Sequence, residues 1–281
     1  MTLTPSQAQR IAEWGIESLA QVDEHPFAWW AMRGEDHVVV KAGDVEPRRR
    51  EAVALRAFDG EVSTCVVEHD VDLGLLVTAR ILPGDDIRPL ARTDDDAATR
   101  AVASLAAKLH SDQRYGTNVS DLPDLREIGT AFDGFADPRI PVSLIADARR
   151  VFLDLVADVV DPVVLHGDLQ HLNVLNAGDG WRAIDPHGWI GDPAFEAAAL
   201  LANPRGLVEG GDARGMDGRE LAGKARRRAA IYAETTGYDV DRLRAWGFVG
   251  CVISELWMIG SHDLVHGAPL AVAEALWEAG L

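Results

Sequence analysis

The residues with the clearest chemical meaning lie between positions 163 and 187. An apolar run at 163–165 leads into a His-Gly-Asp turn that ends on Asp168, and Asn173 follows five residues later. A second apolar run ends on Asp185. Two carboxylates and an amide oxygen can hold a divalent cation and accept the proton of a hydroxyl group. This chemistry is what phosphoryl transfer from ATP requires.

Each of these three residues has a second interpretation. Asp168 is predicted to be the general base, and Gly167 before it permits a sharp turn, but an aspartate in a turn can also bond its own backbone. Asn173 and Asp185 are predicted to be Mg²⁺ ligands, because this ion takes oxygen ligands and retains several waters. The alternatives are a turn cap for Asn173 and a helix or turn start before a proline for Asp185. The three together favour catalysis.

A lysine in the first third of the chain completes the set. Lys41 follows the apolar run 38–40, and an ammonium group at the end of a buried strand needs a partner. Triphosphate oxygens are one such partner, and Glu51, in the first turns of the next predicted helix, is another. The alternative is an edge lysine in solvent with Glu51 as a surface charge. Glu46 competes with Glu51, although it precedes Pro47 and lies outside the predicted helix.

Two other patterns suggest different chemistry and are rejected. His166, His171 and His187 flank the aspartates, but they lack the spacing of paired metal-binding histidines on a helix. We expect His166 to bond backbone carbonyl groups instead. Residues 218–225 approximate the Gly-x-x-x-x-Gly-Lys-Ser/Thr phosphate loop, but Ala225 lacks the hydroxyl group and the segment is typical of a helix. A hairpin at 33–36 is therefore expected to cover the phosphates.

Composition excludes several classes of protein. The chain of 281 residues has a formal net charge of −18, which disfavours nucleic acid as a partner. The acidic surplus serves solubility or attracts a cationic substrate. The two cysteines, far apart, are expected to stay reduced. No apolar run reaches the roughly 20 residues that span a bilayer, and no secretion signal is visible. We therefore expect a cytoplasmic protein with no membrane partner.

The surrounding pattern predicts an α+β chain in two lobes. The N-terminal lobe, 1–82, is predicted to be strand-rich, and the C-terminal lobe, 83–281, to be mostly helical and to carry the catalytic loop 166–173. A glycine-rich loop is expected at 206–218. Strands are predicted at 27–32, 37–41, 62–68 and 73–82, with a strand-turn-strand element at 163–185. Helices are predicted at 6–22, 47–58, 94–110, 125–135, 143–160, 192–201, 219–236, 239–260 and 269–280.

These motifs resemble those of the aminoglycoside phosphotransferases. Residues 165–173, 183–186 and 191–195 are similar to the branch that contains streptomycin 6-kinases and hydroxyurea-resistance kinases. The resemblance implies a bilobal protein-kinase-like fold with ATP and Mg²⁺ between the lobes. It also implies that Asp168 is catalytic, that Asn173 and Asp185 bind the metal, that Lys41 contacts the phosphates, and that backbone groups from Ala79 to Ile81 bind adenine.

The chain departs from that branch at several positions. Gln170 and Leu172 stand where His and Gly are common. His187 stands where a lysine is common, Ala79 stands where a glutamate is frequent, and Glu196 replaces a frequent aspartate. These departures affect the substrate rather than the reaction. The expected activity is phosphorylation of an aminoglycoside hydroxyl by a monomer or homodimer, with His187, Glu196 and Glu255 as candidate substrate contacts. The alternatives are a kinase of a sugar, amino alcohol or nucleoside, and an inactive nucleotide-binding module.

Overall fold

The N-terminal segment forms a short helix and an edge strand. The computed structural model describes residues 2–23, 25–58, 60–111, 119–202, 218–265, 267–278 and 280. Helix α1 (Pro5–Glu13) begins at Thr4, which exchanges hydrogen bonds with Gln7 in a capping box. Gly15 then adopts a φ of +68°, and strand β1 (Ile16–Val22) follows. The prediction of one helix over 6–22 is wrong in its second half, because Gly15 turns the chain and the rest pairs with the sheet.

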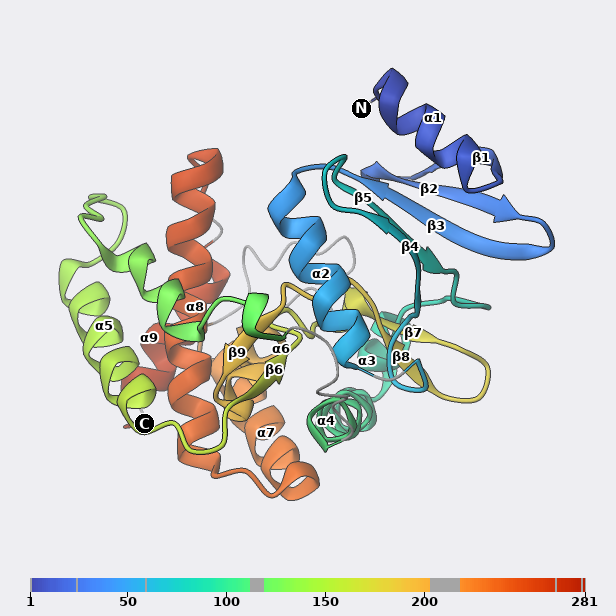
Figure 1. Cartoon of the computed structure of the whole chain (residues 1–281). Helices are drawn as coiled ribbons and strands as arrows, with labels where there is room; N and C mark the ends of the chain where they lie inside the picture. Colours follow the sequence, from blue (N-terminus) through green and yellow to red (C-terminus); the bar gives the residue numbers. More distant parts are fainter. Residues whose placement is uncertain are drawn as a thin grey trace.

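The sheet of the N-terminal lobe has five antiparallel strands in the order β1-β2-β3-β5-β4 (Figure 1). Its other strands are β2 (His25–Arg33), β3 (Asp36–Ala42), β4 (Val66–Asp70) and β5 (Leu75–Ala79). Side chains alternate across it. Val38 and Val40 join Ile11 of α1 in an apolar layer on one face. Lys41 therefore points to the other face, where α2 (Val45–Ala57) packs Leu55 against Leu76.

The register of β2 and β3 corrects the predicted phosphate-covering hairpin. The 33–36 turn joins Arg33 to Asp36 at one end of this pair, whereas Lys41 pairs with Ala28 near the opposite end. The turn between β1 and β2, where Val22 pairs with His25, lies at the Lys41 end. The prediction for residues 33–36 is wrong, because both hairpins are glycine-poor and only the strand order distinguishes them.

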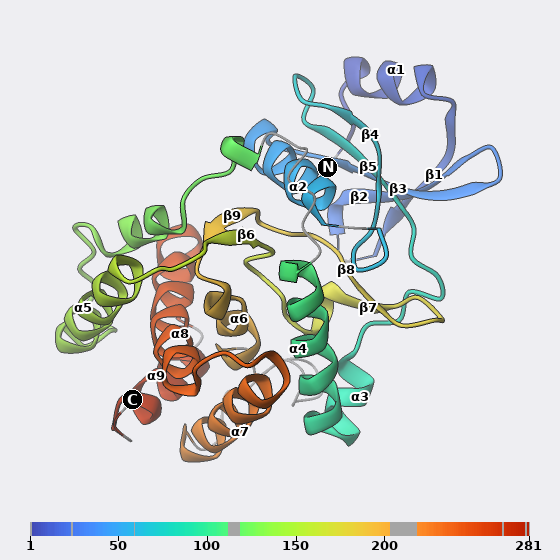
Figure 2. The same ribbon diagram turned by 60° about the horizontal axis from the view of Figure 1, so that its bottom comes forward.

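The C-terminal lobe is predominantly helical (Figure 2). The segment predicted as a helix at 125–135 is a 3₁₀ helix, η2 (Leu125–Phe132), and the one at 192–201 divides into η4 (Pro193–Glu196) and α6. The loop expected at 206–218 falls almost wholly outside the described residues. The α-helices are α3 (Arg88–Thr93), α4 (Asp95–Ser111), α5 (Val142–Ala157), α6 (Ala197–Ala202), α7 (Gly218–Thr236), α8 (Val240–His262) and α9 (Ala268–Glu278).

Helix α8 is long and apolar enough to cross a bilayer by length and composition. The sequence interpretation, that no apolar run reaches that length, overlooked it because Glu255 interrupts the run. More than half of its apolar window is buried inside the protein. Its Trp246 and Phe248 are fully buried, as in the central helix of a globular core.

Two short two-stranded sheets lie between α2 and the helices of the C-terminal lobe (Figures 1 and 2). Strand β6 (Val163–Leu165) pairs with β9 (Trp189–Gly191), and β7 (Val174–Asn176) pairs with β8 (Trp181–Ala183). The N–H of Thr64 donates to the Ala183 carbonyl at 3.0 Å, so the β7–β8 hairpin is bonded to the segment that precedes β4. This hairpin therefore fixes the positions of Asn173 and Asp185, which flank it, relative to the N-terminal sheet.

Candidate active site

The buried side chain of His166 fixes the shape of the turn at 166–168, called the catalytic turn below because Asp168 is the predicted general base. The Nε2–H of His166 donates to the Ile184 carbonyl at 2.7 Å, and its Nδ1 accepts from the Asp168 N–H at 3.3 Å. Burial lowers the pKa of His166, so the ring is neutral and this tautomer satisfies both contacts. Gly167 has a φ of +79°, and a Cβ there would lie 2.7 Å from Cδ1 of Trp189. The expected bond of His166 to a backbone carbonyl is confirmed.

Asp168 and Asn173 are in direct contact. The Asn173 Nδ2 donates to Oδ2 of Asp168 at 2.9 Å and to the Asp168 carbonyl at 2.8 Å. The amide oxygen of Asn173 accepts no hydrogen bond from the described residues, so it remains available as a ligand. The alternative was a carboxylate that bonds its own backbone, but within the described residues both hydrogen bonds to the Asp168 carboxylate come from side-chain amides, those of Asn173 and Gln170.

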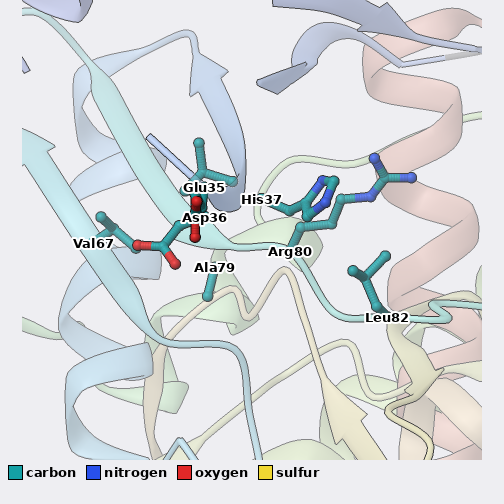
Figure 3. A pocket seen from close by; sticks show the side chains of 8 residues that line it. Glu35, Asp36, His37, Val67, Ala79, Arg80 and Leu82 are labelled. Atoms are coloured by element: carbon teal, nitrogen blue, oxygen red, sulfur yellow. The ribbon is translucent and has the colours of Figure 1, made fainter. Parts of the chain in front are cut away.

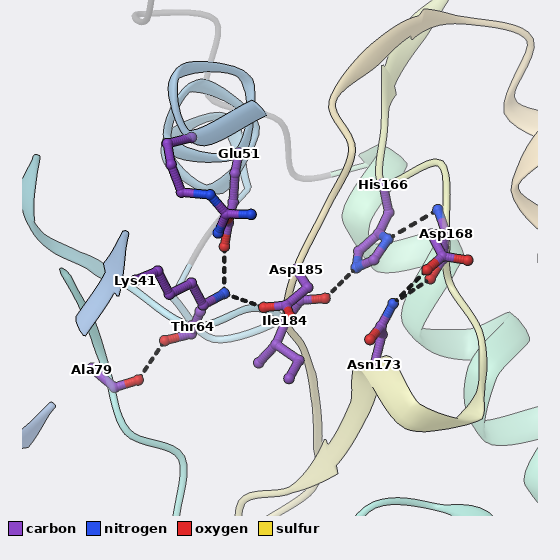
Figure 4. Close-up of polar contacts among 10 residues, drawn as sticks. Lys41, Glu51, Thr64, Ala79, His166, Asp168, Asn173, Ile184 and Asp185 are labelled. Carbon is purple, nitrogen blue, oxygen red and sulfur yellow. Dashed lines mark hydrogen bonds and ion pairs between the residues drawn. The ribbon is translucent and has the colours of Figure 1, made fainter. Parts of the chain in front are cut away.

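Asp185 lies beside Asn173 because of the β7–β8 hairpin. The Ile184 N–H donates to the Asn173 carbonyl at 3.0 Å, which places the next residue at the open end of the hairpin. Asp185 has a φ of +60°, a conformation that is costly for a residue with a side chain. Strain of this kind concentrates at functional sites, and here it accompanies a carboxylate directed toward the N-terminal lobe (Figure 4).

Lys41 connects the two lobes. Its Nζ contacts Oε1 of Glu51 and Oδ1 of Asp185, although Lys41 and Asp185 are 144 residues apart (Figure 4). Burial opposes its charge, but the Asp185 and Glu51 carboxylates outweigh it and raise the pKa of Lys41. Burial likewise opposes the Asp185 charge, and Lys41 lowers the pKa of that carboxylate. Lys41 is 7% exposed, so the alternative of a solvent-facing edge lysine is wrong.

Glu51 is the partner of Lys41, and Glu46 is not. The second Glu51 oxygen contacts Nη1 of Arg48. Glu46 lies in the first turn of α2 rather than before the helix, and pairs with Arg49. The placement of Glu46 outside the helix is therefore wrong. Lys41 and Arg48 balance Glu51 and Asp185, so these four charges sum to zero.

Glu196 supports the catalytic turn from behind. It is 1% exposed, and its two oxygens accept the N–H groups of His166 and Gly167, each at 2.8 Å. His110 contacts the same carboxylate at 3.2 Å and Tyr238 at 2.8 Å. The expectation that Glu196 binds substrate is wrong, because every oxygen already serves the protein. His110 and Tyr238 were not identified from the sequence, where nothing links positions 110, 196 and 238.

The other two candidate substrate residues differ from each other. Glu255 is fully buried in α8 and accepts the Gly267 N–H at 3.1 Å just before α9, so its predicted substrate contact is also wrong. His187 is exposed, and its backbone N–H donates to the His166 carbonyl at 2.7 Å beside the catalytic turn. Neither ring nitrogen of His171 has a hydrogen-bond partner among the residues that the structure describes, and burial lowers its pKa to about 3. Among the described residues, no three or more His, Cys, Asp or Glu side chains gather to hold a metal.

The segment after β5 carries the backbone groups predicted to meet adenine. The Ala79 carbonyl accepts from the Thr64 hydroxyl at 2.6 Å, while the Ile81 N–H makes no hydrogen bond to any described residue. The Arg80 guanidinium stacks 4.0 Å from the Trp30 ring. A pocket of about 370 Å³ adjoins this segment (Figure 3). Its lining includes residues 35–38, around the start of β3, whereas Lys41 lies near the other end of that strand.

Comparisons with known proteins identify the family of this chain. The model of the aminoglycoside/hydroxyurea antibiotic resistance kinase family matches residues 30–261. The chain is 34% identical over 192 residues to a streptomycin 3''-kinase of Klebsiella pneumoniae, covering 66% of this chain and 67% of that protein. It is 33% identical over 240 residues to a streptomycin 6-kinase of Streptomyces griseus, covering 80% and 71%. A hydroxyurea phosphotransferase of Kitasatospora aureofaciens is 32% identical, covering 80% of this chain and 63% of that protein.

Solved structures share the fold. The aminoglycoside phosphotransferase APH(4)-Ia superposes with a TM-score of 0.65 at 17% identity, covering 98% of both chains. The choline kinase of Streptococcus pneumoniae superposes with a TM-score of 0.64 at 15% identity, covering 97% of this chain and 96% of that one. The fold is thus the bilobal protein-kinase-like fold, with a small strand-rich N-terminal lobe and a larger helical C-terminal lobe. The chain belongs to the aminoglycoside/hydroxyurea antibiotic resistance kinase family and is a phosphotransferase with an alcohol group as acceptor.

Proposed function

We propose that this protein transfers the γ-phosphoryl group of ATP to a hydroxyl group of a streptomycin-like aminoglycoside. The observation that carries the proposal is the contact of Lys41 with both Glu51 and Asp185, next to the Asp168–Asn173 pair. Each of these groups has a purpose in phosphoryl transfer. An inactive nucleotide-binding module would have no need for all of them together.

The nucleotide is proposed to lie between the lobes 1–82 and 83–281. Lys41 would bind the phosphates, with Glu51 holding its position. The Ile81 N–H, free within the described part of the chain, would donate to adenine, and the Ala79 carbonyl would accept from it. A carbonyl oxygen has two lone pairs, so the hydrogen bond from Thr64 leaves Ala79 able to do so.

The residues proposed as metal ligands fit Mg²⁺. Asn173 and Asp185 present an amide oxygen and a carboxylate at the end of one hairpin, and Mg²⁺ completes its shell with phosphates and water. When bound, the ion would neutralise charge on the phosphates. Asp185 already bears a lowered pKa, so it is ionised at neutral pH and ready to act as a ligand. This pair of oxygen donors differs from the three protein ligands, mostly histidines, that hold a catalytic zinc ion.

The transfer step assigns one role to Asp168. The acceptor oxygen forms a bond to the γ-phosphorus, and the bond from that phosphorus to the β–γ bridging oxygen breaks with its electron pair leaving on ADP. The proton of the acceptor hydroxyl passes to the Asp168 carboxylate late in the step. Asp168 is only half-buried, so its carboxylate would be accessible to an acceptor.

The acceptor is proposed to be cationic. Two of the relatives named above are streptomycin kinases, and the formal charge of −18 attracts a cationic molecule at long range. His187, exposed beside the catalytic turn, remains a candidate for contact with it. We further propose that the protein acts in the cytoplasm, where ATP is present, without a nucleic-acid or membrane partner, and as a monomer or homodimer.

A panel of acceptors tests this function. The purified protein is incubated with Mg²⁺, ATP and streptomycin, hygromycin B, hydroxyurea, choline or a hexose, and ADP release is followed with mass spectrometry of each product. We expect acceptor-dependent ADP release and addition of one phosphoryl group to streptomycin. Transfer to choline or the hexose alone would instead establish a metabolite kinase. ATP binding without transfer to any acceptor would contradict the proposed function.

A further inference from the structure

Gln170 contacts the catalytic carboxylate and has no role in the function described so far. Its Nε2 donates to Oδ2 of Asp168 at 3.0 Å. Asn173 donates to the same oxygen at 2.9 Å. Two amide N–H groups thus converge on one oxygen of Asp168, and the other oxygen, Oδ1, accepts no hydrogen bond from the described residues.

The backbone holds Gln170 where it can make this contact. Its own N–H donates to the Asp168 carbonyl at 2.9 Å, and its carbonyl accepts the Asn173 N–H at 3.0 Å. The three residues therefore form one closed turn that opens the 3₁₀ helix η3 (His171–Asn173). Because the main chain of Gln170 is fixed at both ends, the half-buried side chain can be changed without moving Asp168 through the backbone.

The double contact has a physical consequence for Asp168. The terminal torsion of an aspartate side chain is broad and roughly two-fold, so a carboxylate with no partner exchanges its oxygens easily. Two donors on Oδ2 stop that rotation and direct Oδ1 away from the turn. Asn173 alone cannot give the same restraint. Its amide oxygen is also proposed to bind a metal, so the orientation of its side chain would depend on the position of that metal.

We propose that Gln170 is a positioning residue for phosphoryl transfer, which together with Asn173 anchors Oδ2 of Asp168 and leaves Oδ1 as the proton acceptor. The inference rests on the proposed function. In the transfer step, the acceptor oxygen bonds to the γ-phosphorus, ADP leaves with the electron pair of the broken P–O bond, and the hydroxyl proton moves to Oδ1. A neutral amide achieves this anchoring without placing a cation beside the general base.

The contact predicts a specific kinetic signature. Gln170→Leu keeps the size of the side chain but removes the donor, so kcat should fall about 10- to 100-fold, a part of what a general base contributes. The KM for ATP should stay within about twofold, because the carboxylate that Gln170 contacts, Asp168, is not among the groups proposed to bind the nucleotide. A residue that only stabilised the turn would lower the melting temperature and change KM and kcat together.

Two further variants keep the test independent of folding. Gln170→His restores a donor at this position and should recover most of the lost kcat. Gln170→Glu has the original size but faces Oδ2 with an acceptor, and should lose at least as much kcat as Gln170→Leu. Gln9→Leu is the matched control, because Gln9 lies on exposed α1 and bonds only Glu13, so it should behave as wild type.

The experiment measures kcat and KM for ATP of all variants by ADP release with the acceptor that the wild-type protein uses best. Loss of kcat in Gln170→Leu and Gln170→Glu with recovery in Gln170→His supports the inference. Wild-type kcat in Gln170→Leu, a change confined to KM, or no recovery in Gln170→His overturns the role of Gln170 and leaves the proposed function intact. Absence of transfer by the wild type with every acceptor overturns both.

Discussion

Replacement of Glu196 by glutamine tests how the catalytic turn is supported. The carboxylate accepts the N–H groups of His166 and Gly167 at 2.8 Å each and contacts His110 at 3.2 Å. An amide can offer an oxygen to one of those backbone groups, but its NH₂ then faces the other donor. One buried N–H loses its partner, and the negative charge that the other contacts of this side chain share is lost.

The size of the effect follows from these contacts. Leaving a buried donor without the charged acceptor that it had costs about 3 kcal/mol. For a chain of this size, each kcal/mol lowers the melting temperature by about 2–4 °C, so Glu196→Gln should lose roughly 10 °C. Turnover should fall as well, because the released N–H groups belong to the turn that carries Asp168. The control is Glu220→Gln, which removes a solvent-exposed ion pair with Lys224 and should leave both properties unchanged.

The loss should also depend on pH. Burial raises the pKa of Glu196, but the contacts with His110, His166 and Gly167 outweigh it and bring the pKa below the ordinary 4.5. A carboxylate with a lowered folded-state pKa stabilises the fold above the unfolded value and loses that contribution as pH falls through the folded value. The deficit of Glu196→Gln should therefore be full at pH 7 and shrink below about pH 4.5. Thermal unfolding followed by circular dichroism checks this, and equal melting temperatures of variant and wild type at pH 7 would refute the reasoning.

Two further substitutions test packing around the site. Gly188→Ala should destabilise the fold and lower turnover, because Gly188 has a φ of +69° and a Cβ there would lie 2.9 Å from the Arg50 carbonyl in α2; a wild-type melting temperature would contradict this. Arg228→Met should cost about 3–5 kcal/mol, because Arg228 is 2% exposed and pairs with Asp95 at 2.6 Å. The neighbouring Arg227→Met, which removes an exposed ion pair with Asp96, should change stability little, and denaturant titration that finds equal losses in both would be evidence against buried pairing.

The residues that the structure brings together at the candidate site were identifiable from the sequence, because each has a local signature. A polar residue directly after a buried strand identifies Lys41 and Asp185, and the spacing from Asp168 to Asn173 fits one turn. Glu51 was predicted because an ammonium group at the end of a buried strand needs a counter-charge. The structure adds that one amine touches both carboxylates, which no local pattern contains.

The failures share a physical cause, which is dependence on distant partners. Glu196 resembles a cleft carboxylate until its partners, two backbone N–H groups about 30 residues earlier, are known. The apolar positions Ile11, Trp14, Ile16 and Leu19 fit one helix, yet Ile16 begins a strand because β2 offers it an edge. In the same way, the pairing of the strands, and no local pattern, determines which hairpin lies at the Lys41 end of the sheet. Each error concerns a pairing that tertiary structure settles.

The most direct test of the account is Asp168→Asn, which keeps the size of the side chain and removes the proton acceptor. The variant should bind Mg-ATP with an affinity within about threefold of wild type by calorimetry, since Lys41, Glu51 and Asp185 are untouched. Its kcat for transfer to the acceptor should fall about 10²- to 10⁴-fold. Wild-type turnover by Asp168→Asn would contradict the assignment of the general base, and with it the central claim that these residues surround the transferred phosphoryl group.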